Sequence, residues 1–142
     1  MGEFDQHQTL AFQAAALARH LAIRLRDALE PLGLMPAQFA ALTEIGRADG
    51  MTQKELVERL DVEQPGVART LTGLEADGWI ERRAKAGRSQ GLYLTEKARG
   101  VLPRATQTVA DVNRQALADL SRTERDLLLD QIDALVSGLR AG

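Results

Sequence analysis

Residues 52–98 read TQKELVERLDVEQPGVARTLTGLEADGWIERRAKAGRSQGLYLTEKA, and the fold class follows from the elements predicted within them. A capping box at Thr52 and Glu55 predicts the start of a short helix. A second helix is predicted over residues 64–77, ahead of a turn at Gly78. Its apolar residues recur at the spacing of one buried helical stripe: Val67, Leu71 and Leu74. Two short helices separated by a tight turn are typical of a helix-turn-helix.

The hydrophobic period changes after Gly78. Residues 79–83 and 92–94 predict two short strands, since apolar residues there are no longer spaced as in a helix. The segment between them, 84–91, is small, polar and basic, and predicts the loop of a β-hairpin. A helix pair followed by a basic hairpin has the order of a winged helix-turn-helix.

The flanking sequence predicts helices on both sides of this unit. Helices are expected over the first thirty residues, from near Pro36 to residue 48, from Thr95 onward, and from a second capping box at Ser121 to the C-terminus. Pro103 is expected to kink or break the third of these. We therefore predict a mainly α chain with a small β-hairpin: a winged helix-turn-helix over 49–103, and a helical region formed by 1–48 and 104–142.

Charge is unevenly distributed along the chain. The 142 residues contain 18 Lys and Arg against 20 Asp and Glu, a net charge of −2 that argues against nucleic acid as a partner. Residues 79–104, however, contain seven basic and two acidic residues, while 1–51 and 105–142 are each net acidic. A local basic patch of this kind attracts phosphate groups even when the whole chain does not.

Several classes of function are excluded by composition and motif. With no cysteine, the chain has no disulfide, thiolate metal site or thiol redox sensor. His7 and His20 are too far apart on one helix to pair on a metal, and no catalytic or phosphate-loop motif occurs, so we expect no metal, no cofactor and no enzymatic activity. No apolar run reaches bilayer length and no secretory signal is visible, so a soluble cytoplasmic protein is expected, with no membrane partner.

The second helix of the predicted pair has the features of a DNA-reading helix. Its outward face carries small side chains around Arg69, which lets the helix enter a major groove where an arginine pairs with guanine. The residues at its N-terminus are expected to lie nearest the bases: Gln64, Pro65 and Gly66. Taken alone, Arg69 is better interpreted as a solvated surface arginine. Together with the preceding helix and the basic hairpin, it favours the DNA interpretation.

The hairpin provides a second set of candidate DNA contacts. Arg88, near the loop tip, is predicted to enter the minor groove, whose narrow A·T-rich form attracts arginine. Arg83 and Lys85 are predicted to contact phosphates, which contribute affinity and salt sensitivity. The remaining residues predicted to contact the DNA backbone are Thr52, Gln53 and Thr70. The alternative is that each basic residue serves only to keep the hairpin soluble, because its charge prevents the strand edges from pairing with another chain.

Residues 60–75, with 78–80 and 94–98, resemble the MarR family of transcriptional regulators. Within the family, the similarity is highest to the SlyA branch, on Glu63-Gln64-Pro65, Val67, Arg69-Thr70-Leu71 and Leu74-Glu75. The resemblance implies a homodimer with intertwined terminal helices, in which two winged helices read a pseudo-palindrome in double-stranded DNA. It also implies a regulator, expected here to be a repressor.

The resemblance assigns roles to individual residues. Arg69 matches the base-contacting arginine of the family's recognition helix, and Arg88 matches the minor-groove arginine of its wing. The family usually carries an aspartate two residues before the wing arginine, where this chain has Ala86, and the wing is shorter than in the SlyA branch.

A small aromatic acid is the effector that the resemblance implies, bound between the dimerisation helices and the DNA-binding domain. The candidate pocket residues are Arg19, His20, Gln38 and Phe39, with Arg19 as the partner of the carboxylate. The alternative is that Phe39 belongs to the core and the others to the surface or an interface.

A different class of function remains open from sequence. A winged helix also serves as a protein-interaction module without specific DNA binding, and the low net basicity favours that alternative. Steep salt dependence of DNA binding would count against it.

Overall fold

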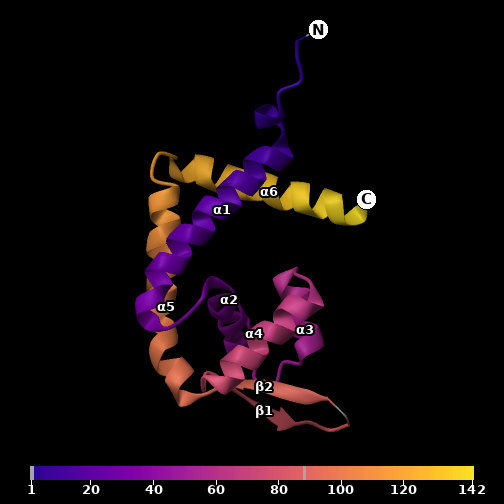
Figure 1. Cartoon of the computed structure of the whole chain (residues 1–142), viewed down its shortest axis with the longest axis vertical. Helices are drawn as coiled ribbons and strands as arrows, with labels where there is room; N and C mark the ends of the chain where they lie inside the picture. The colour runs from indigo at the N-terminus through magenta and orange to yellow at the C-terminus, as the bar shows by residue number, and fades with distance from the viewer. Residues whose placement is uncertain (1, 88) are drawn as a thin grey trace. The chain divides into compact units, whose positions relative to one another are not determined.

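The computed structural model describes residues 2–87 and 89–142, and the chain forms two compact units, Met1–Val109 and Ala110–Gly142. The described residues are mainly helical, with one antiparallel β-hairpin (Figure 1). The elements are α1 (Leu10–Leu29), α2 (Pro36–Arg47), α3 (Gln53–Leu60), α4 (Gln64–Ala76), β1 (Ile80–Ala84), β2 (Gln90–Leu94), α5 (Glu96–Ala116) and α6 (Arg122–Ala141), with short 3-10 turns at 6–8 and 30–32. The predicted order of elements is confirmed.

Both predicted capping boxes are present. The Thr52 hydroxyl accepts from the Glu55 backbone N–H at 3.2 Å, and the Glu55 carboxylate accepts from the Thr52 N–H at 3.4 Å. Ser121 and Glu124 make the same reciprocal pair at 3.2 and 2.9 Å. Each box satisfies backbone donors that the first turn of a helix leaves without a partner.

The turn between α3 and α4 depends on a left-handed residue. Asp61, at the C-terminal end of α3, has φ of 54°, in the region that aspartate tolerates better than most residues. This single residue turns the chain into α4, whose N-cap is Glu63. The sharp turn produces the helix-turn-helix.

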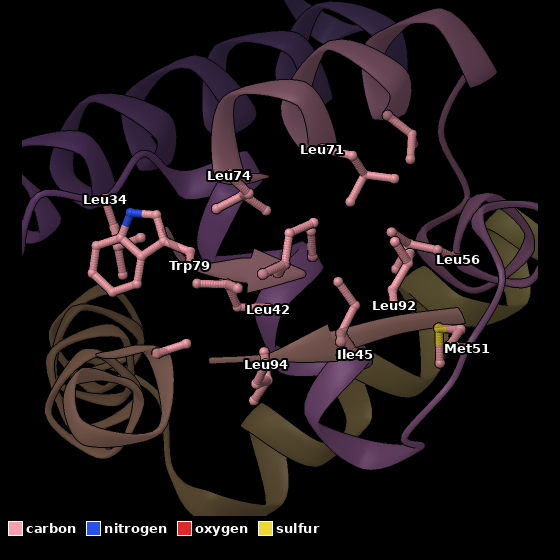
Figure 2. Packing of buried hydrophobic residues seen from close by; sticks show 14 of the residues in the cluster. Leu34, Leu42, Ile45, Met51, Leu56, Leu71, Leu74, Trp79, Leu92 and Leu94 are labelled. Carbon is pink, nitrogen blue, oxygen red and sulfur yellow. The ribbon is translucent and has the colours of Figure 1, made fainter. Parts of the chain in front are cut away.

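The core of the first unit joins α2 to the helix-turn-helix and the hairpin. Figure 2 shows Leu42 and Ile45 of α2 in one cluster with Leu71 and Leu74 of α4 and with Leu92 of β2. All five side chains are fully buried, which stabilises the fold by about 1.5–3 kcal/mol each. The predicted buried stripe of α4 is therefore confirmed.

The hairpin is longer than the sequence pattern predicts. β1 pairs with β2 from Ile80 opposite Leu94 to Ala84 opposite Gln90; β1 packs beside α4, and β2 packs beside α3 (Figure 1). The backbone N–H of Lys85 then donates to the Ser89 carbonyl at 3.1 Å, so the loop is shorter than predicted. The basic loop is therefore carried on a paired ribbon.

Helix α5 continues through Pro103, so the break that was one of the two expected outcomes there does not occur. The other outcome, a kink at Pro103, stays a prediction. The described helices include none with the length and apolarity needed to cross a membrane.

Candidate nucleic-acid interface

The N-terminus of α4 is open to solvent. Gln64, Pro65 and Arg69 are exposed, and a side chain built on half-buried Gly66 would meet no atom within 4 Å. Arg69 makes no hydrogen bond or ion pair with any other described residue. The predicted base-reading residues therefore share one free end and face of α4, consistent with the geometry of a recognition helix.

The sides of α4 that flank its buried stripe are only partly free. Thr70 is half-buried, and with Arg69 it lines a groove of about 390 Å³ against Ala37 and Ala40 of α2. Gly73 is half-buried as well, and a Cβ built there would lie 3.8 Å from the Gln38 amide nitrogen of α2. Residues on one side of α4 therefore pack against α2, and Arg69 lies at the edge of that contact.

The two wing cations predicted to contact phosphate already have partners within the chain. Arg83 is paired with Glu81 and stacks over the Tyr93 ring, 4.3 Å from its centroid. The hydrogen bonds that the Arg83 guanidinium donates to the Glu81 carboxylate raise the pKa of Arg83, so the guanidinium stays charged. The Lys85 ammonium donates to the Gly50 carbonyl at 2.9 Å. Both cations lie on the hairpin, and each must exchange or share its partner to bind phosphate.

Arg82 is a functional candidate to which the sequence analysis assigned no role. Its Nε donates to the Glu75 carboxylate of α4 at 3.3 Å, and its Nη1 donates to the Gln53 side chain of α3 at 3.4 Å. The side chain is 22% exposed. Arg82 lies two residues after Ile80, so the two side chains share one face of β1. Because Ile80 is apolar and buried, this spacing in the sequence already indicates that Arg82 points toward the helices.

A polar depression of about 400 Å³ lies where the hairpin meets the N-terminus of α3. Its lining includes Thr52, Gln53 and Lys54 from the start of α3, and Arg82 from β1. The first turn of a helix carries partial positive charge, and the cationic side chains of Lys54 and Arg82 add to it. This depression suits a phosphate group of the DNA backbone.

The base of the wing approaches the α2–α3 loop closely. The Gly50 N–H donates to the Leu92 carbonyl at 3.1 Å, and the Leu92 N–H donates to the Met51 carbonyl at 2.8 Å. A Cβ on buried Gly91 would lie 2.9 Å from the Gly50 Cα. Only glycine fits at residue 91 without displacement, and the contact fixes the hairpin to the helix-turn-helix.

Arg88, predicted to enter the minor groove, lies outside the described residues. Gly87, the residue before it in the sequence, has φ of +88°, a conformation that glycine adopts without strain.

The four residues predicted for an effector pocket have separate local contacts. Arg19 and His20 are exposed on α1, with 3.3 Å between Nη2 and Nε2. The Gln38 side chain accepts from the Met35 backbone N–H at 2.8 Å and so caps α2, while Phe39 packs against the core. Gln38 and Phe39 thus contribute to folding of α2 in this structure.

A helix-turn-helix with a free N-terminal end on its second helix, followed by a cationic hairpin, defines a winged-helix nucleic-acid-binding protein. Comparisons with known proteins agree. The family model described as "MarR family" matches residues 32–89. An uncharacterized HTH-type transcriptional regulator of Bacillus subtilis, YwoH, is 31% identical over 118 residues, covering 82% of this chain and 86% of the relative.

Solved structures share the whole fold. A MarR variant from E. coli in complex with operator DNA aligns at a TM-score of 0.85 and 23% identity, covering 93% of this chain and 99% of that chain. A MarR family protein of Mycobacterium tuberculosis in complex with salicylic acid aligns at 0.71 and 25% identity, covering 92% and 98%. The chain belongs to the MarR family of DNA-binding transcriptional regulators.

Proposed function

We propose that the protein is a cytoplasmic, ligand-responsive repressor that binds a pseudo-palindromic operator as a homodimer. The observation that carries the proposal is the exposed N-terminal end of α4, where Arg69 has no hydrogen-bond or ion-pair partner among the described residues, in a unit that also carries a cationic hairpin. Within the family we propose the SlyA branch, on the motif at residues 63–75. Residues 49–103 would bind DNA, and 1–48 with 104–142 would supply dimerisation.

Base reading is proposed for α4. Arg69 donates two N–H groups to guanine O6 and N7 in the major groove, and Gln64 contacts base edges from the first turn. Pro65 and Gly66 leave room for the backbone to approach the bases. Arg69 has no ion pair or hydrogen bond with any other described residue, so it would break no such bond on binding a base, which supports its role as the main specific contact.

Contacts with the DNA backbone are proposed for the start of α3, for α4 and for the wing. Thr52 and Gln53 would bind phosphate in the depression at the start of α3, and Thr70 would do so from α4. Arg83 and Lys85 would bind the phosphates beside the minor groove, with Arg88 entering it. Binding is then expected to weaken steeply with salt, by close to one unit of log–log slope for each phosphate contacted.

Fluorescence anisotropy on DNA selected from a genomic pool tests the proposal. Arg69→Ala is expected to lower the affinity for the selected site by about 10–100-fold and to leave affinity for random DNA unchanged. Arg24→Ala, on an exposed arginine of α1, is the matched control. Equal binding of selected and random DNA by the wild type, with little salt dependence, would instead favour a protein-interaction module.

The homodimer is proposed from uncovered apolar side chains in each unit. No residue of α6 is buried, and its large exposed apolar residues are Leu127, Leu129, Ile132, Leu135 and Leu139, between 40% and 75% exposed. In the first unit, Leu10 and Leu17 of α1 are more than half exposed. Large apolar side chains gathered on one exposed helix are uncommon on monomers and mark interaction sites.

Sedimentation velocity tests the dimer. The wild type is expected to sediment as a dimer at micromolar concentration, and Leu135→Glu is expected to sediment as a monomer. Asp133→Asn, a polar change on the same helix, is the control. A monomeric wild type across the whole concentration range would refute the dimer and leave the DNA proposal to be judged by anisotropy.

A small aromatic acid is proposed as the effector. The salicylic acid complex of the Mycobacterium tuberculosis relative supports this class. Arg19 and His20 are exposed and available to a carboxylate, with Gln38 and Phe39 proposed to complete the pocket. Salicylate is expected to release operator DNA from the wild type and to do so less effectively from Arg19→Gln. Unchanged DNA binding at saturating salicylate would refute this effector.

A further inference from the structure

The residue at the N-cap of α4 does not cap the helix. Glu63 has an extended backbone and directly precedes Gln64, yet its side chain accepts no backbone N–H of the first turn. By contrast, Thr9, Thr52 and Ser121 each accept such an N–H at 3.2 Å at the start of their own helices. The residues preferred at an N-cap are Ser, Thr, Asp and Asn, and glutamate is not among them. Capping of α4 therefore does not explain why a glutamate lies here.

The Glu63 carboxylate has no role in packing or pairing either. It is exposed, and it makes no hydrogen bond or ion pair with any other described residue. The carboxylates of Glu75 and Glu81, in the same unit, are paired with arginines of the hairpin. The partial positive charge at the start of α4 favours any carboxylate, but an aspartate would supply the same charge and cap the helix as well. A residue that breaks a local folding rule is a candidate for a functional role.

The position of Glu63 suggests what that role is. It lies at the free end of α4, next to the residues proposed to read bases, where DNA phosphates repel a carboxylate. Base edges in the major groove offer it a partner, because cytosine and adenine carry amino groups there. The adenine edge also presents the N7 acceptor, which repels a carboxylate, whereas the cytosine edge presents only the N4 donor. A carboxylate that can only accept therefore matches cytosine best and rejects guanine O6 and thymine O4.

We propose that Glu63 is a specificity-determining residue that selects cytosine in the operator. Its carboxylate accepts a hydrogen bond from the cytosine N4 amino group in the major groove. Arg69 lies six residues later, about 9 Å along the helix axis, and donates to a guanine of a different base pair. One side chain of α4 thus reads a donor and the other reads acceptors. This inference rests on the proposed function, because it requires α4 to lie in the major groove.

Selection of bound sequences from a random DNA pool by the full-length protein tests the inference. The wild type is expected to enrich cytosine at one position of each half-site. Glu63→Gln is expected to lose this preference and keep the other enriched positions, because an amide both donates and accepts and so fits several bases. Replacing that C·G pair by T·A should weaken binding by the wild type about tenfold in anisotropy, and binding by Glu63→Gln less than about twofold.

A matched variant separates base reading from general electrostatics. Glu58→Gln removes the same charge from an exposed glutamate of α3. It is expected to change the affinity for selected and random DNA alike and to keep the cytosine preference. Thermal melts check that both variants are folded.

Three results would overturn the inference. If Glu63→Gln enriches the same bases as the wild type, or if Glu58→Gln loses the cytosine preference equally, Glu63 does not read a base, and the proposed function still stands. Enrichment of adenine at the position that depends on Glu63 would overturn the assignment to cytosine. A wild type that enriches no sequence would refute the proposed function together with this inference.

Discussion

Gly91→Ala is expected to be strongly destabilising. The added Cβ would lie 2.9 Å from the Gly50 Cα, 3.1 Å from the Gly50 carbonyl oxygen and 3.0 Å from a Tyr93 ring carbon. Two of these atoms belong to the backbone, so the strand and the loop must separate to relieve the clash. Separation strains the two hydrogen bonds that join Leu92 to the α2–α3 loop at 3.1 and 2.8 Å.

The size of the effect follows from these two costs. Overpacking costs about 1–3 kcal/mol and a weakened backbone hydrogen bond about 1 kcal/mol, so the free energy of unfolding should fall by about 2–4 kcal/mol. For a chain of this length that corresponds to a decrease in Tm of about 6–12 °C. The wing would also shift relative to α4, and affinity for operator DNA should fall even well below Tm.

Urea denaturation followed by circular dichroism, at one fixed protein concentration, measures the free energy of unfolding. Gly100→Ala in α5 is the matched control, because a Cβ there meets no atom within 4 Å. It is expected to stabilise the helix by about 0.5–1 kcal/mol. If Gly91→Ala unfolds within about 0.5 kcal/mol of the wild type, the close approach of the wing base to Gly50 is refuted.

Three further changes test the wing and the last helix. Arg82→Lys keeps the charge but not the two directed hydrogen bonds, so operator affinity measured by anisotropy should fall about 3–10-fold; affinity equal to the wild type would indicate a simple phosphate contact. Glu81→Gln frees Arg83 and removes a negative charge beside the DNA, so affinity should rise and the salt dependence should become steeper in the same assay; weaker binding would contradict this. The Ser121 backbone hydrogen bond lowers the pKa of Glu124 below its ordinary 4.5. This carboxylate therefore stabilises the fold above that pH and stops doing so as the pH falls through the lowered pKa, so Glu124→Gln should lose less Tm than the wild type between about pH 6 and pH 3; equal losses in thermal melts would contradict the capping role.

Features that depend on local sequence were predictable. The capping boxes at Thr52 and Ser121 require residues only three positions apart, and the order of helices follows from apolar spacing along each segment. The strand ends were less accurate. Gln90 and its partner Ala84 are polar or small and thus resemble loop residues, yet cross-strand hydrogen bonding extends the ribbon to them.

Features that depend on contacts distant in sequence were not predictable. Arg82 reaches Gln53, 29 residues earlier, and no local pattern specifies that partner. Helical spacing places Gly73 away from the stripe of Val67, Leu71 and Leu74, but it contains no information about α2, whose Gln38 amide nitrogen lies 3.8 Å from a Cβ built on Gly73. The partners of Arg83 and Lys85 likewise depend on how the hairpin packs, so sequence alone counted them as free cations.

These internal partners also explain how a chain of net charge −2 can bind DNA. Arg82 and Arg83 each share their charge with a neighbouring carboxylate, and such exposed pairs contribute only about 0–1 kcal/mol to stability. Exchanging a weak pair for a phosphate therefore costs little, while the pair holds the side chain in position before DNA arrives. Arg69 has no such pair among the described residues, and the proposed binding of its side chain to a base would be opposed mainly by the loss of side-chain entropy. Under the proposed function, the wing is therefore preorganised for affinity, and Arg69 of α4 is kept for discrimination between bases.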